Sequence, residues 1–280
     1  MTAAERFAQA RPRLLRLAYS ELGDLGEAED VVQEAWLRLE RVRAEEIENL
    51  DGWLTTVVGR LALDRLRSAR ARRETYVGPW LPEPLVSDDP ADRVTLDESV
   101  SYALLTVLEQ LSPAERTAFL LHDVFDVPFG DVAEVVGRTP EAVRQLASRA
   151  RRHVANERPR FAASRDEHER TVRAFAQAVA DGDLESLVAV LDPDVLWTSD
   201  GGGRANASLK PVRGDARVAR AWAALSRRFV HAPIEVELNG RLGLVLPTGD
   251  GHRTVLSFVV GHGRIARIDA IRNPEKLRRL

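Results

Sequence analysis

Residues 112–152 read SPAERTAFLLHDVFDVPFGDVAEVVGRTPEAVRQLASRARR, and the turns within this stretch decide the fold of the region around it. Its first four residues, Ser112-Pro113-Ala114-Glu115, form a capping box with proline at the first helical position, which predicts the start of a helix. The Val127-Pro128 pair breaks the helical pattern, and Gly137 ends a second, short helix. Thr139-Pro140 then begins a last helix, so the stretch predicts short helices joined by tight turns.

The last of these helices has two different faces. The apolar face, which is expected to be buried, holds Val143, Leu146, Ala147, Ala150 and Val154. The opposite face holds Glu141, Arg144, Gln145, Ser148 and Arg152, flanked by Arg149 and Arg151. A short helix, a glycine-containing turn and such a helix make the helix-turn-helix layout. Its arginines and glutamine can pair with base edges or neutralise phosphates, although helical hairpins that bind no DNA share this pattern.

Two longer helices are expected within residues 5–74. The first buries a stripe at helical spacing: Ala28, Val31, Val32, Ala35, Trp36, Leu39 and Val42. Its outer face carries a second stripe of mixed acidic and apolar character: Asp30, Gln33, Glu34 and Leu37. This second stripe indicates either a protein-binding surface or plain exposure to solvent.

The second long helix continues past its apolar stripe with arginines. It is expected to bury Leu50, Trp53, Leu54, Val57, Val58 and Leu61 and to present Thr56, Arg60 and Arg67 on its far side, with Arg70, Arg72 and Arg73 continuing past the apolar stripe. Residues 60–73 hold six arginines against one aspartate, and residues 138–160 hold seven against two glutamates, whereas residues 21–51 carry eleven acidic residues against three arginines. Two basic segments in a chain of net charge −3 indicate an anionic partner, with solvated helix faces as the alternative.

Composition places the chain among ordinary globular proteins. Its 280 residues are 44% hydrophobic and 30% charged, which allows two or three domains with cores of their own. The absence of cysteine excludes disulfides and thiolate metal sites, and we expect neither a metal nor a cofactor. No stretch reaches the roughly 20 apolar residues of a membrane helix, and the first residues lack a signal-peptide layout. We therefore expect a cytoplasmic protein without membrane contact.

The second half of the chain changes class. Residues 75–93 hold four prolines and are expected to form a linker without regular structure. From about residue 166, helical stretches precede strands expected at 234–238, 242–246, 254–260 and 264–271, with hairpin turns at 239–240, 250–251 and 261–263. Three helices against a curved antiparallel sheet would make an α+β cone at 166–280, after all-helical domains at 1–74 and 94–160.

Three of these segments resemble sigma factors, the promoter-recognition subunits of bacterial RNA polymerase. Residues 22–39, LGDLGEAEDVVQEAWLRL, resemble the polymerase-binding helix, residues 50–73 resemble the element that reads and melts the −10 promoter box, and residues 112–152 resemble the domain that reads the −35 box. The resemblance implies a sigma-2 domain at 1–74, a sigma-4 domain at 94–160, and core RNA polymerase and promoter DNA as partners, so the protein would be nucleoid-associated when bound to polymerase. It assigns polymerase binding to Asp30, Gln33, Glu34 and Leu37 and DNA contact to the polar faces of the two basic helices. Arg60 stands where minimal sigma factors usually have asparagine.

Three short motifs resemble signatures of the group-41 extracytoplasmic-function sigma factors. They are WLPEPL (Trp80, Leu81, Pro82, Glu83, Pro84, Leu85), DGGG (Asp200, Gly201, Gly202, Gly203) and NPEKL (Asn273, Pro274, Glu275, Lys276, Leu277). Glu275 departs conservatively from the usual aspartate. The resemblance implies a fused SnoaL-like domain, with the fold of nuclear transport factor 2, that regulates the sigma factor in cis in place of a separate anti-sigma protein.

The motif residues also make a prediction on their own evidence. Trp80, Leu81 and Leu277 are apolar in segments without a local core, so we expect the C-terminal domain to pack against the linker. The alternative is that Trp80 covers only its own domain.

Two other functions remain open alternatives at this point. SnoaL-like folds include enzymes with a pocket carboxylate or histidine, and the candidates here are Asp194, Asp200, His231, His252, His262 and Asp269. No acid and base pair can be placed in the cone from sequence, so we expect no catalysis, and fold alone does not license it. A transcription factor that senses a ligand through the cone is the other alternative, and it would not need the segment at 22–39.

Overall fold

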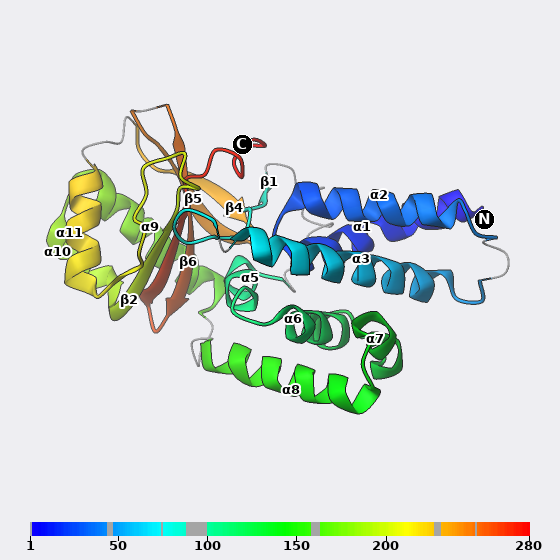
Figure 1. Cartoon of the computed structure of the whole chain (residues 1–280). Helices are drawn as coiled ribbons and strands as arrows, with labels where there is room; N and C mark the ends of the chain where they lie inside the picture. Colours follow the sequence, from blue (N-terminus) through cyan, green and yellow to red (C-terminus); the bar gives the residue numbers. More distant parts are fainter. Residues whose placement is uncertain are drawn as a thin grey trace. The chain divides into compact units, whose positions relative to one another are not determined.

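The computed structural model describes residues 2–43, 47–73, 75–87, 100–157, 163–226, 231–249 and 251–280. The chain divides into two compact units (Figure 1). The helical unit comprises Met1–Glu74, Thr95–Val100 and Leu104–Glu157. The α+β unit comprises Thr75–Val94, Ser101–Ala103 and Arg158–Leu280. Residues 75–87, part of the expected linker, therefore lie in the α+β unit.

Three long helices begin the helical unit: α1 (Ala3–Leu22), α2 (Leu25–Leu39) and α3 (Leu50–Arg73). Local sequence sets their ends, because Thr2 caps α1 in a capping box with Glu5 and Asp24 caps α2. Gly23, at φ 66°, makes the left-handed turn between them. The expected stripe on α2 is buried as far as Leu39, where the helix ends, except that Trp36 is half-buried. Val42 lies past that end and is 42% exposed, so its assignment to the buried stripe was wrong.

The remaining helices of this unit follow the turns read from the sequence. They are α5 (Tyr102–Leu108), whose first two residues belong to the α+β unit, α6 (Pro113–Phe119), a π-helical turn η2 (Leu120–Val124), α7 (Phe129–Val136) and α8 (Pro140–Glu157). The Ser112–Glu115 capping box is present, Gly137 ends α7 at φ 70°, and the Thr139 hydroxyl caps α8. Leu108, Phe119, Ala150 and other apolar side chains form the core under α8. The helix-turn-helix of α7 and α8 is confirmed.

Within the helical unit, α1 packs against α6 through buried polar groups. The Arg116 guanidinium is almost fully buried, donates to the Ser20 carbonyl at 3.0 Å and pairs with Glu109. The Thr117 hydroxyl donates to Glu21 at 3.1 Å. Glu21 has no exposed surface and one of its carboxylate oxygens has no partner, and burial raises its pKa to about 7.

The α+β unit is a sheet covered on one face by α9 (Arg165–Asp181), α10 (Leu184–Val190) and α11 (Asp215–Ser226) (Figure 1). The strand order is β1-β4-β5-β6-β7-β2-β3. The strands are β1 (Val86–Ser87), β2 (Leu191–Asp200), β3 (Val212–Arg213), β4 (Ile234–Leu238), β5 (Arg241–Pro247), β6 (Arg253–Gly261) and β7 (Arg264–Ile271). Aromatic rings fill the space under the helices, with Phe175 5.6 Å from Trp222 and 5.3 Å from Phe258 between ring centroids.

The expected α+β class and its four C-terminal strands are confirmed, and two details are corrected. The sheet is mixed instead of antiparallel, because β2 pairs with β7 in parallel. The segment expected to lack regular structure contributes β1, which pairs with β4 at the sheet edge. The predicted turns at 239–240 and 261–263 are present, with left-handed Asn239 (φ 45°) and His262 (φ 52°) each followed by glycine, whereas Asp250 of the third predicted turn lies outside the described residues.

Candidate functional site

The polar face of α8 is exposed, as the sequence predicts. Gln145, Ser148 and Arg152 lie on this exposed face, together with three arginines that pair with acidic side chains. Arg144 lies 3.4 Å from Glu141, Arg149 lies 2.9 Å from Glu115, and Arg151 lies 2.9 Å from Asp123. All three arginine side chains are about half exposed, so they can exchange these partners for a phosphate or a base.

The corresponding face of α3 is only partly open. Arg60 and Arg67 are exposed and Thr56 is half-buried. The Arg60 guanidinium donates to the Glu134 carbonyl of α7 at 3.1 Å and 3.3 Å, and Arg67 lies 3.3 Å from Asp64. The side chain of Arg70 lies outside the described residues.

The outer stripe of α2 has the mixed character expected of it. Gln33 is exposed, and Leu37 is 38% exposed although it is a large apolar side chain. Asp30 lies 3.5 Å from Arg65, and Glu34 lies 3.0 Å from Arg38 on the same helix. A leucine exposed on the same helix face as two acidic side chains fits a protein surface that carries basic groups around an apolar contact.

The most elaborate arrangement of polar groups is a buried one, around Asp200 at the end of β2. We call it the linker site and define it by Tyr76, Leu81, Asp200, Asn273 and Lys276. One carboxylate oxygen of Asp200 accepts from the Tyr76 hydroxyl at 2.6 Å and from the Gly202 amide at 3.1 Å. The other accepts from the Leu81 amide at 2.9 Å and from the Lys276 ammonium at 2.6 Å. Asp200 is fully buried, and its four donors come from the linker, its own loop and the C-terminal tail.

Lys276 has further partners at the linker site. Its side chain is 6% exposed, and its ammonium also donates to the Leu81 carbonyl. The same nitrogen lies 3.9 Å from the centroid of the Trp80 ring and 5.3 Å from that of Tyr76. A buried ammonium requires such compensation, since a carboxylate, a carbonyl and aromatic faces replace the water that it has lost.

Tyr76 ties the tail to the same carboxylate. Its hydroxyl donates to Asp200 and accepts from the Asn273 amide at 2.8 Å. Burial and the Asp200 carboxylate raise the pKa of Tyr76 well above its usual value, so it remains a hydrogen-bond donor. The backbone amides of Arg272 and Asn273 in turn donate to the Asp200 carbonyl at 2.7 Å and 3.0 Å.

The glycines that follow Asp200 are explained by close approach to this site. Gly202 has φ 58°, and a Cβ there would meet the Asn273 amide and the Tyr76 hydroxyl. A Cβ on Gly201 would meet the Ala205 carbonyl, and one on Gly203 (φ 70°) would lie 3.2 Å from Val77. Gly202 and Gly203 therefore allow the linker and the tail to contact the end of β2, and Gly201 allows its own loop to turn tightly.

Apolar side chains and backbone groups complete the contact. Leu81 (3% exposed) belongs to a cluster with Tyr102, Leu238, Val245, Val255 and Ile271, and Leu277 packs against it. Pro82, Glu83, Pro84 and Leu85 are buried, whereas Pro274 is half-buried. The Leu85 amide donates to the Asn239 side chain at 3.1 Å, and the Tyr102 hydroxyl donates to the Pro82 carbonyl at 2.8 Å. Glu275 alone in the tail motif is exposed, where it lies 2.8 Å from Arg204.

Sequence reasoning missed three members of this arrangement. Tyr76, Asn239 and Tyr102 lie outside the quoted motifs, and their partners are 20 to 197 residues away along the chain. The only available signal was the position of Tyr76, an aromatic residue just before the proline-rich segment.

The candidate catalytic residues do not gather into a reacting group. Asp200 is occupied by the linker and tail, and buried Asp269, whose pKa burial raises, pairs with Arg267 at 2.8 Å. Asp194 is exposed on β2, and His231 and His262 are exposed on loops. Among the described residues, no group of three or more acidic, histidine or cysteine side chains is placed to hold a metal ion.

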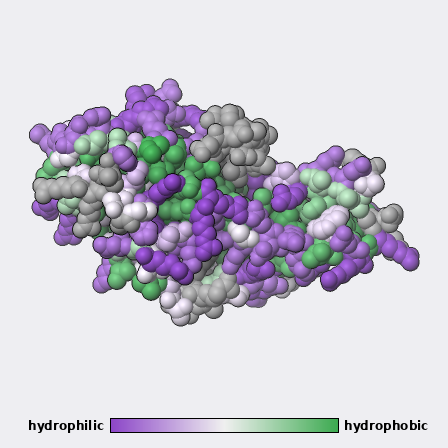
Figure 2. Space-filling model, turned by 90° about the horizontal axis from the view of Figure 1, so that it is seen from above, coloured by the Kyte–Doolittle hydropathy of each residue, from purple (hydrophilic) through white to green (hydrophobic). Residues whose placement is uncertain are grey.

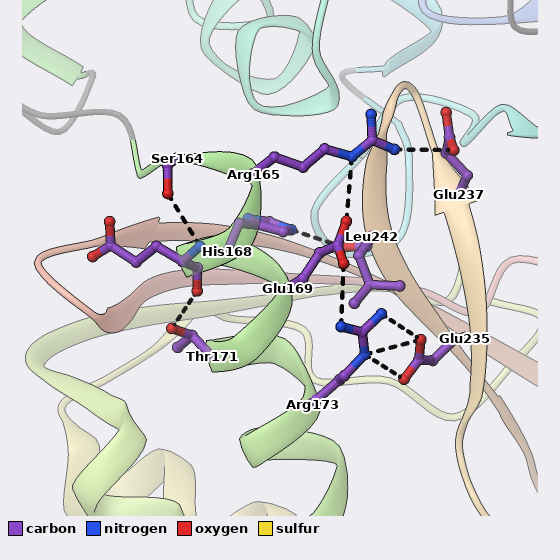
Figure 3. Close-up of polar contacts among 10 residues, drawn as sticks. Ser164, Arg165, His168, Glu169, Thr171, Arg173, Glu235, Glu237 and Leu242 are labelled. Atoms are coloured by element: carbon purple, nitrogen blue, oxygen red, sulfur yellow. Dashed lines mark hydrogen bonds and ion pairs between the residues drawn. The ribbon is translucent and has the colours of Figure 1, made fainter.

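A further histidine, His168, is buried in the α+β unit and has a structural role (Figure 3). Its Nε2 lies 2.9 Å from the Leu242 carbonyl, and burial lowers its pKa. Around it, Arg173 bonds Glu169 on α9 and Glu235 on β4, which fastens the helix to the sheet (Figure 3).

No described helix is both long enough and apolar enough to cross a bilayer. The space-filling view shows hydrophilic side chains over much of the face drawn, with smaller hydrophobic patches between them (Figure 2).

Comparison with known proteins finds sigma-factor families and relatives. The Sigma-70 region 2 family matches residues 7–72, and the Sigma-70 region 4 family matches residues 101–154. The ECF RNA polymerase sigma factor SigJ of Mycobacterium tuberculosis is 41% identical over 96% of this chain and 91% of its own length. The probable ECF RNA polymerase sigma factor SigI of the same species is 36% identical over 95% of this chain and 92% of its own. The crystal structure of Mycobacterium tuberculosis SigJ superposes with a TM-score of 0.81 at 38% identity, covering 99% of this chain and 98% of that one.

Proposed function

The chain belongs to the extracytoplasmic-function RNA polymerase sigma factors, and we propose that its C-terminal α+β domain regulates it in cis through the linker site. As a sigma factor it is not an enzyme; it binds core RNA polymerase and promoters. The motifs at 80–85, 200–203 and 273–277 support a place in group 41 of these factors.

One observation carries the regulatory proposal: a single buried carboxylate, that of Asp200, bonds both the linker and the tail. In sequence, the linker follows the region that reads the −10 element and precedes the region that reads the −35 element. A linker held along 75–87 by the α+β domain has fewer conformations than a free chain of that length. The domain thereby biases which arrangements of the two reading regions are available to polymerase and promoter.

The residue roles follow from the exposed surfaces. The α2 stripe of Asp30, Gln33, Glu34 and Leu37 is proposed to dock on a basic helical element of core polymerase. On α3, Thr56, Arg60, Arg67 and Arg70 are proposed to contact the −10 element, where a base must leave the stack to open the duplex. On α8, Arg144, Gln145 and Ser148 are proposed to read −35 bases, with Arg149, Arg151 and Arg152 on phosphates.

We propose further that this factor needs no separate anti-sigma protein. A domain that restrains the linker from within the chain supports regulation without a separate anti-sigma protein. We propose that the factor works in the cytoplasm on the nucleoid, where polymerase and promoters are found.

Transcription reconstituted from purified core polymerase, promoter DNA and this chain alone tests the proposal. We expect promoter-dependent transcripts from the full chain and an altered yield or promoter preference when residues 273–280 are deleted, because Lys276 and Asn273 are then lost from the linker site. Transcription without this chain is the control. Equal transcription from the full and shortened chains would show that the α+β domain has no regulatory part.

A further inference from the structure

An aromatic ring on α7 contacts one arginine of the α8 reading face. Arg144 lies over the ring of Phe129, with its guanidinium carbon 5.3 Å from the ring centroid. Phe129 is the first residue of α7, and it is half-buried. A cation–π contact attracts the charge of the guanidinium to the ring and uses none of its N–H groups as a donor to an oxygen, so they stay available for hydrogen bonds.

The Phe129 ring is itself held in place. It stacks on the imidazole of His122 with a centroid distance of 3.7 Å and an interplanar angle of 29°. His122 lies in the π-helical turn η2, and its Nδ1 lies 3.0 Å from the Val127 carbonyl. The backbone of the Val127-Pro128 break thus fixes His122, His122 supports Phe129, and Phe129 supports Arg144.

The other paired arginines of α8 are held in a different way. Arg149 donates from Nε to Glu115 at 2.9 Å, and the Nε of Arg151 lies 2.9 Å from an Asp123 carboxylate oxygen, so both guanidinium groups are already paired with a carboxylate. Arg144 also has a carboxylate near it, but Glu141 lies 3.4 Å away, at the long end of hydrogen-bond distances. The ring contact is therefore the feature that sets Arg144 apart from Arg149 and Arg151.

We infer that Phe129, supported by His122, is a positioning residue that presets Arg144 to read a base pair of the −35 element. The inference rests on the proposed role of α8 in promoter reading. A paired hydrogen bond from arginine to guanine requires the guanidinium plane to lie in the plane of the base. An arginine whose plane is fixed before binding loses less conformational freedom when it forms that pair. Binding to a base that cannot form the pair is not strengthened in this way, so the fixed plane increases discrimination.

Holoenzyme reconstituted with the full chain tests this inference on a set of promoters in which each −35 position is varied. Arg144→Ala first identifies the base pair that Arg144 reads. Phe129→Leu, which keeps an apolar side chain without the ring, is then expected to reduce discrimination at that same base pair by about 2–5-fold, the range of an exposed cation–π contact. The salt dependence of binding should remain that of the parent, because no phosphate contact is removed. Phe129→Tyr keeps the ring and should restore the parental preference.

The outcomes separate this inference from the proposed function. If Arg144→Ala changes no −35 preference, the assignment of α8 as the reading helix fails. If Arg144→Ala changes one position but Phe129→Leu weakens all promoters equally, or changes none, the positioning role is overturned. Should Phe129→Leu fail to fold, Phe129→Trp provides the test, since its larger ring should hold or raise discrimination at the same base pair, and a loss there would overturn the inference.

Discussion

Replacing Asp200 with asparagine is expected to destabilise the α+β unit strongly. The substitution is nearly isosteric, but it leaves the Lys276 ammonium buried without its carboxylate. It also places an amide NH2 group among four donors, those of Tyr76, Leu81, Gly202 and Lys276. Removing one partner of a buried ion pair typically costs about 3–5 kcal/mol, and we expect a loss in that range.

A double-mutant cycle assigns this loss to the pair itself. Lys276→Met removes the ammonium and leaves Asp200 with three donors, so it should cost less than Asp200→Asn. The double variant should be more stable than the sum of the single losses predicts, by about 1–3 kcal/mol. Glu275→Gln is the matched control, because Glu275 lies in the same tail motif but pairs with Arg204 in solvent. Its cost should stay below about 1 kcal/mol.

Urea unfolding of the full chain measures these differences, with the transition of the α+β unit followed by far-UV and near-UV circular dichroism. The reasoning is refuted if Asp200→Asn and Glu275→Gln lower the free energy of unfolding equally. If the loss of the double variant equals the sum of the losses of the two single variants, Asp200 and Lys276 are not coupled, and the reasoning is refuted as well.

Three further predictions concern the helical unit. Reversing the charge of Asp30 and Glu34 together to lysine should weaken binding to core polymerase, measured by titration of labelled core enzyme, without changing the circular dichroism spectrum; parental affinity would refute the docking surface. Gln145→Ala should relax preference at one or two −35 positions by about 1–3 kcal/mol each, whereas Arg151→Ala should weaken binding to every sequence and lower the salt slope by about one, as competition binding would reveal. Glu21 retains its proton up to a pKa of about 7 when folded but ionises near 4.5 when unfolded, so stability should fall by about 3 kcal/mol between pH 4.5 and 7. Glu21→Gln should remove that part of the pH dependence, and an unchanged pH profile by thermal unfolding would contradict the burial argument.

Local signals in the sequence predicted much of the fold. Ser112, Gly137 and Thr139 act within four residues of themselves, so their caps can be read without knowing the rest of the chain. The error at Val42 has the same origin, because periodicity continues past Leu39 although the helix does not. The parallel pairing of β2 with β7 joins residues more than 70 positions apart, and no local pattern encodes it.

The linker site was predicted in part. The motifs and the apolar residues of the linker indicated that the linker, the glycine loop and the tail belong together. The sequence could not show that Asp200 is their common partner, or that Tyr76 joins them, because each of those contacts spans 76 residues or more. The hydrogen bond from Arg60 to the Glu134 carbonyl could not be predicted either, because the two residues are 74 positions apart.

The most direct test of cis regulation measures transcript yield with core polymerase and a promoter selected with the full chain. The yield is compared between the variants Lys276→Met and Glu275→Gln. Both variants change one charge of the same tail motif, but only Lys276 belongs to the linker site. Regulation through that site predicts that Lys276→Met changes transcript yield by about fivefold or more, the lower end of a typical coupling between two sites. Glu275→Gln should transcribe like the parent. Parental transcription from Lys276→Met, in protein that retains its fold, would contradict the account.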